Sequence, residues 1–65
     1  MTKKQLKKLA MEIAACEYAV QTGDEEAVNK AKEKIVKLTE SADLTMDEII
    51  QCDEMVAKIL EDKNI

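Results

Sequence analysis

A helix-start signal that occurs three times within 65 residues constrains the fold most. A threonine is followed three positions later by Gln or Glu at Thr2–Gln5, Thr22–Glu25 and Thr45–Glu48. In this motif each of the two side chains accepts a hydrogen bond from a backbone N–H group that the first helical turn leaves without a partner. At the second start, Gly23 could instead end the preceding helix in the left-handed conformation, which would leave Asp24 as the cap.

Apolar residues recur at steps of three and four after each start signal. They form three stripes: Leu6, Leu9, Ile13, Cys16 and Val20; Val28, Ala31, Ile35, Leu38 and Ala42; and Ile49, Cys52, Val56, Ile59 and Leu60. This spacing places one apolar face on each helix. We therefore predict helices over residues 3–21, 24–40 and 46–62, in a single domain that spans residues 1–65. Because short connections make neighbouring helices antiparallel, the predicted fold class is all-α, an up-down-up three-helix bundle.

A chain of this length buries only about 60% of the surface that its unfolded form exposes. Small domains therefore add a disulfide, a metal or a second subunit. The sequence has two cysteines and no histidine. Cys16 and Cys52 differ in height by roughly 10 Å on parallel helices, whereas a disulfide needs Cα atoms within about 7 Å. We expect free thiols, so a second subunit is the remaining source of support.

Side chains suited to catalysis are missing or poorly placed. The commonest general base and metal ligand is absent because there is no histidine. Adjacent acids such as Asp47 and Glu48 point about 100° apart on a helix, as solvated surface residues do. There is no glycine-rich phosphate loop. We predict that the protein is not an enzyme, with no catalytic residues, no metal site and no cofactor.

The net charge of −4 is distributed unevenly. Four Lys and two Glu give residues 1–22 a charge of +2, whereas two Lys and seven acids give residues 43–65 a charge of −5. Binding of bare nucleic acid rests on a basic surface, and a helix-turn-helix built from the last two helices would present an acidic recognition helix. Bare nucleic acid is therefore not an expected partner, and a DNA-binding regulator is the least favoured reading.

The basic start followed by I-A-A-C is similar to a lipoprotein signal, but Glu12 interrupts the apolar run. A secretory signal needs about 7–15 apolar residues, and a membrane span needs about 20. We expect no membrane association and a cytoplasmic location.

The first predicted helix carries apolar residues on two opposite faces. At 100° per residue, Met11, Ala15 and Tyr18 lie opposite the Leu6–Val20 stripe, and Ala14 lies between them and Ala10. Met and Tyr are enriched in interface cores. A two-fold interface lets one patch pair with itself, so we expect a homodimer, although incidental exposure remains the alternative. The interface candidates are Met11, Ala14, Ala15, Tyr18 and Ile50, and Val36 also lies off the main stripes.

The runs KKLAMEIAACE (7–17), EEAVNKAKEKIVKL (25–38) and DEMVAKIL (53–60) resemble small all-helical proteins encoded by phages and prophages of Gram-positive bacteria. The resemblance implies expression inside a bacterial cell and assigns no functional residues.

Two functions are consistent with these features. The first is a small protein–protein interaction or assembly module that associates with itself. The alternative is a phage-type inhibitor or sequestering protein that binds a basic site on a host factor through its acidic third helix.

Overall fold

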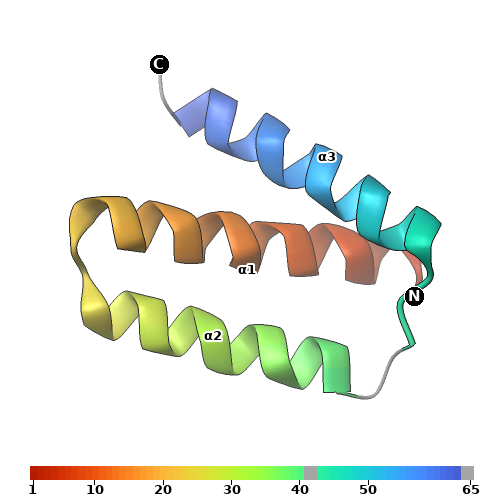
Figure 1. The fold of residues 1–65 in the computed structure, drawn as a ribbon, viewed down its shortest axis with the longest axis horizontal. Coiled ribbons are helices and arrows are strands. Elements are labelled where there is room, and N and C mark those ends of the chain that lie inside the picture. The colour runs from red at the N-terminus through yellow and green to blue at the C-terminus, as the bar shows by residue number, and fades with distance from the viewer. Residues whose placement is uncertain (41–42, 64–65) are drawn as a thin grey trace.

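The computed structural model describes residues 1–40 and 43–63, apart from the side chain of residue 63. These residues form three helices, α1 (Lys3–Thr22), α2 (Glu25–Glu40) and α3 (Met46–Lys63). Helix α2 runs antiparallel to α1, and α3 returns in the direction of α1 (Figure 1). The predicted all-α, up-down-up fold is confirmed, and each predicted helix boundary lies within one residue of the observed one.

The first and third start signals form complete capping boxes. The Gln5 backbone N–H donates to the Thr2 hydroxyl at 3.2 Å, and the Thr2 N–H donates to Gln5 Oε1 at 2.9 Å. At α3 the Glu48 N–H donates to the Thr45 hydroxyl at 3.2 Å, and the Thr45 N–H donates to Glu48 Oε1 at 3.0 Å. Both helices therefore begin where side chains replace the missing backbone acceptors.

At the second break the glycine alternative is correct. Gly23 has a φ of 76°, in the left-handed region, and the Asp24 N–H donates to the Ala19 carbonyl at 2.9 Å. This closes α1 in the manner of a Schellman motif. Asp24 Oδ1 then accepts from the Ala27 N–H at 3.1 Å and caps α2. The Thr22 hydroxyl donates back to carbonyls of α1 instead of capping α2.

Helix α1 is the central element of the fold. It packs against both α2 and α3, while no described Cα atom of α2 comes within 8 Å of one in α3. Figure 1 shows α1 between the other two helices, with α3 diverging from it toward the carboxyl end. The Cα atoms span 31 × 25 × 17 Å, and the three helices lie side by side across the broad face of the molecule as an open layer (Figure 1).

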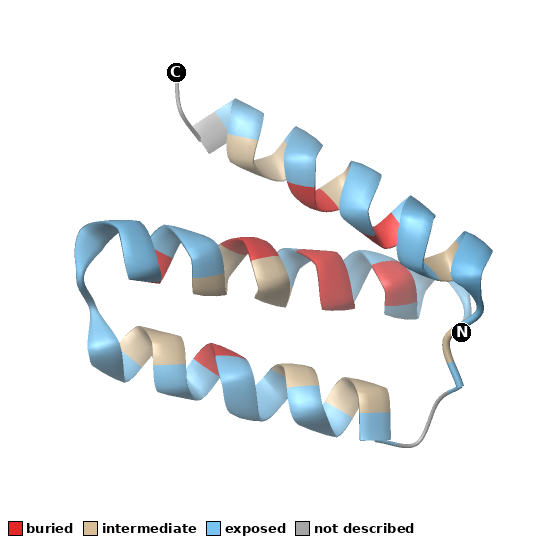
Figure 2. Cartoon of the chain, in the orientation of Figure 1, coloured by how far each residue is buried: buried red, intermediate tan, exposed pale blue. Residues whose placement is uncertain are grey.

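The buried residues lie mainly on the sides of α1 that face α2 and α3, and on the facing sides of those helices (Figure 2). One buried cluster consists of Leu6, Leu9, Ala10, Ala14, Cys52 and Val56. Ile35 and Leu38 of α2 and Met55, Ile59 and Leu60 of α3 pack against it, partly buried. Because the described Cα atoms of α2 and α3 stay more than 8 Å apart, the remaining stripe residues keep some exposure.

Among the described stripe residues, two are exposed to solvent. Val20 is 62% exposed, and Ile49 is also exposed. Val20 lies in the last turn of α1, and it lines an open hollow together with Gly23 and Val28. The predicted core position Ala42 lies outside the described residues.

Candidate interaction site

The outer α1 face, which we define as Met11, Ala15 and Tyr18, lies largely in solvent. Met11 is 55% and Tyr18 is 46% exposed, and Ala15 is half-buried. These residues continue a line of lysines along the same side of the helix, since Lys4, Lys7, Met11, Ala15 and Tyr18 follow one another at steps of three and four. The face is therefore basic at the start of α1 and apolar further along.

Ala14 does not belong to this face, contrary to the prediction. Its exposed fraction is 0%, and it lies in the core cluster with Cys52 and Val56 of α3. The physical reason is that α1 is packed on two sides, so its buried arc is wider than a single stripe. Ala10 and Ala14 are small enough for α3 to approach closely there. Ala14 is a core residue and is not available to a partner.

Ile50 is exposed, but it lies on another surface. Its exposed fraction is 51%, and at 100° per residue it is turned roughly 140° away from the buried side of α3 formed by Cys52 and Val56. Met46, one turn earlier, is 72% exposed. We define the outer α3 face as Met46, Ile50, Glu54, Ala57 and Glu61, which follow one another at steps of three and four.

Sequence reasoning missed Met46. The signal that could have found it is its position one turn before Ile50, on the same side of the third helix and off the main stripe. Val36, on α2, is exposed as well and lies on neither outer face.

The two outer faces belong to helices of opposite charge. Helix α1 carries four Lys and two Glu, for a net charge of +2. Helix α3 carries six acids and two Lys, for a net charge of −4. The outer α3 face is accordingly apolar at its amino end and acidic further along, the reverse order of the outer α1 face.

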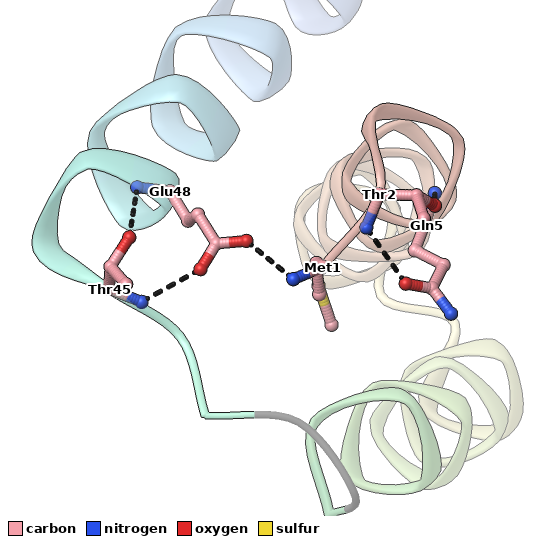
Figure 3. Close-up of polar contacts among 5 residues, drawn as sticks. All are labelled: Met1, Thr2, Gln5, Thr45 and Glu48. Carbon is pink, nitrogen blue, oxygen red and sulfur yellow. Dashed lines mark hydrogen bonds and ion pairs between the residues drawn. The ribbon is translucent and has the colours of Figure 1, made fainter.

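An ion pair ties the starts of these two helices together. The α-amino group of Met1 lies 2.7 Å from Glu48 Oε2, and Figure 3 shows it facing the carboxylate that also accepts from the Thr45 N–H. The hydrogen bond from the Met1 ammonium and that from Thr45 lower the pKa of Glu48 to about 2. The carboxylate is ionised throughout the neutral range and joins the amino ends of α1 and α3.

Cys16 and Cys52 are free thiols. Burial, followed by the charge of Asp53, raises the pKa of the Cys52 thiol. A buried thiol of this kind packs as a small apolar side chain.

A hollow of about 320 Å³ lies between α1 and α2, lined by Lys8, Glu12, Lys34, Lys37 and Leu38. The Lys34 ammonium lies 3.9 Å from Glu12 Oε1, and the lysine is mostly exposed. The arrangement is a solvated ion pair at the junction of two helices.

Within residues 1–40 and 43–63, no three metal-ligating side chains are grouped so that they could hold an ion. None of the described helices has the length and apolar character required to cross a membrane. Comparison of the chain with protein-family models, curated proteins and solved structures yields no match.

Proposed function

We propose that the protein is a small, non-enzymatic interaction and assembly module that associates with itself, acting in the cytoplasm. The observation that carries this proposal is the exposure of large apolar side chains on two of the three helices. Met11 and Tyr18 extend from the central helix, and Met46 and Ile50 from α3. Interfaces are enriched in Met and aromatic residues, and grouped apolar exposure is unusual in a monomer.

The surface area supports the same proposal. The chain exposes 5050 Å², whereas a compact monomer of 7.3 kDa exposes about 4,200 Å². The excess is about 850 Å², and a stable complex buries about 800 Å² on each partner. One interface of standard size would therefore bury about as much surface as this chain exposes in excess of a compact monomer.

Light scattering on the wild type and on Tyr18→Glu tests the proposal. We expect the wild type to have the mass of a dimer, and Tyr18→Glu to be a folded monomer, because a carboxylate would be buried in an apolar contact. Val20→Glu is the matched control, since Val20 is an exposed apolar residue of the same helix on the opposite side. Loss of the dimer in both variants, or in neither, would show that the outer α1 face is not part of the contact.

A second candidate function is favoured by the charge of α3. With a net charge of −4 and most of its acids exposed, this helix suits a basic site on another protein. In that case the protein is an inhibitor or sequestering factor of the phage type, acting on a factor of the bacterial host. Such binding weakens steeply in about 0.5 M NaCl, because the salt screens interactions between charges that lie more than a few ångströms apart. Apolar self-association persists at that salt concentration.

A further inference from the structure

We infer that the second copy packs on the outer α1 face in the antiparallel direction, so that the lysine end of each α1 lies beside the Tyr18 end of the other. The two-fold axis lies in the interface at right angles to α1, midway between Met11 and Ala15, and it pairs the same face of both copies in opposite directions. The inference rests on the proposed self-association, and it adds the direction and the register of the two helices. A second copy suits this face, because the excess surface of about 850 Å² matches what one partner of a stable complex buries.

The outer α1 face points out of the layer between the contacts that α1 makes with α2 and α3. Glu12, whose carboxylate pairs with Lys34 of α2, lies about 100° from Met11 around α1. Ala14, which lies in the buried cluster with Cys52 of α3, is about 60° from Met11 in the other direction. Between these two contacts Met11 is 55% exposed. A second copy can therefore reach α1 directly from this side.

The hairpin formed by α1 and α2 carries opposite charge at its two ends. Residues 1–12 and 34–40, which form its open end, carry six Lys and two Glu, for a side-chain charge of +4. Residues 13–33, which contain the turn, carry five acids and two Lys, for a charge of −3. Because α2 runs antiparallel to α1, the two basic segments lie together (Figure 1), and Lys8 and Lys37 line the same hollow there.

This separation of charge selects the antiparallel direction. When α1 of the second copy runs the opposite way, each basic end lies over an acidic end, and the symmetry provides this attraction twice. In a parallel dimer Lys4 and Lys7 would lie against the same lysines of the second copy, and the two basic ends would repel each other. The partial charges at the helix ends also attract one another only when the two helices are antiparallel.

The sizes of the apolar side chains set the register. Met11 opposite Ala15 of the second copy places a large side chain against a small one, and the symmetry repeats this pair. In this register Tyr18 lies opposite Lys8 of the second copy, where the ring and the ammonium group attract each other. The two copies of Lys4 are then about 27 Å apart along the helix, since each lies about nine residues from the axis.

Neutralising two lysines distinguishes the two directions by the sign of the effect on dimerisation. Lys4→Gln with Lys7→Gln removes attraction to the acidic end of the second copy, and we expect the dimer to become at least about fivefold weaker at low salt. In a parallel dimer the same change relieves repulsion and strengthens association. Both lysines are exposed, so the fold is expected to stay intact, which circular dichroism checks. Sedimentation equilibrium measures the dissociation constant.

The control is Lys32→Gln. Lys32 is an exposed lysine of α2 that lines the hollow beside Val20, on the side of the layer opposite the outer α1 face. Its neutralisation changes the net charge without touching the contact, and we expect the dissociation constant to stay within about twofold of the wild type.

A distance between labels gives the direction independently. A chain with Cys16→Ala and Cys52→Ala carries one nitroxide spin label at Lys4→Cys, and pulsed electron paramagnetic resonance measures the distance between the two labels of a dimer. We expect about 30 Å, from about 27 Å along the helix and about 8–10 Å between the helix axes. A parallel dimer gives a distance below about 20 Å, because both labels then lie at the same height. Light scattering checks that the labelled chain is a dimer.

Weaker association of the Lys4 and Lys7 variant than of the control, with labels about 30 Å apart, supports the antiparallel contact. Unchanged or stronger association, an equal loss in the control, or labels less than about 20 Å apart overturns it and leaves self-association standing. A wild type that is monomeric at every concentration overturns both. Where the labelled chain does not dimerise, the sign of the lysine effect in the otherwise native chain decides.

Discussion

The α-amino group of Met1 and the carboxylate of Glu48 are 2.7 Å apart, and they join the starts of two helices that begin 43 residues apart along the chain. The two helices run in the same direction, so this contact sets how α3 begins against α1. From that end α3 diverges, which leaves the carboxyl half of the layer open (Figure 1).

The Glu48 pair predicts a dependence of stability on pH. Because its pKa falls from 4.5 to about 2 on folding, the carboxylate stabilises the fold fully above pH 4.5 and loses this contribution as the pH falls toward 2. Glu48→Gln should therefore lower the free energy of unfolding near neutral pH, and the difference from wild type should shrink between pH 4.5 and 2. Urea unfolding over this range measures it.

Glu40→Gln is the control for that experiment, since Glu40 is an exposed acid at the end of α2. Its difference from wild type should stay small throughout. Curves for Glu48→Gln that run parallel to wild type down to pH 2 would contradict the role given to the ion pair.

Capping of α2 is expected to depend on Asp24 and not on Thr22. Asp24→Ala removes the acceptor for the Ala27 N–H and should cost about 1 kcal/mol of unfolding free energy. Thr22→Ala should change it by less than about 0.5 kcal/mol. Thermal or urea unfolding measures both variants. A larger loss of unfolding free energy for Thr22→Ala than for Asp24→Ala would indicate that Thr22 caps α2.

Gly23 is expected to matter through its backbone alone. Its φ of 76° is unfavourable for other residues, yet an added Cβ would meet no atom within 4 Å. Gly23→Ala should therefore destabilise the fold by about 1–2 kcal/mol, and Gly23→Asn by less, because Asn tolerates this conformation. Equal losses for Ala and Asn would point to a steric cause instead.

Leu9 and Val20 occupy the same predicted stripe and should behave differently. Leu9 is 2% exposed and Val20 is 62% exposed. Leu9→Ala should cost about 2–5 kcal/mol, a large share of the stability of so small a domain. Val20→Ala should cost less than about 0.5 kcal/mol. Similar losses at both positions would mean that the hollow beside Val20 is closed in solution.

The sequence predicts the helices closely because their ends are set by local chemistry. Thr2 and Thr45 cap their helices with residues three positions away, and Gly23 ends α1 through its own conformation. None of these interactions depends on how the helices pack. The choice between Thr22 and Asp24 as cap needed the structure, because both side chains can accept the same kind of hydrogen bond.

The candidate site was only partly predictable, because exposure depends on packing. Met11 and Tyr18 were found from helical periodicity alone, since they lie opposite the core stripe. Ala14 was misplaced because the central position of α1 gives it a second packed side, which one stripe does not reveal. Val20 was misplaced because it lines an open hollow at the last turn of α1, and such a hollow depends on how the helices pack, which their separate patterns do not contain.

The central claim is that the protein associates with itself, and its mass in solution tests this most directly. Light scattering at several protein concentrations and in about 0.5 M NaCl should give twice the 7.3 kDa of one chain, with Tyr18→Glu reduced to a single folded chain. A wild type that remains at 7.3 kDa at every concentration would contradict the claim.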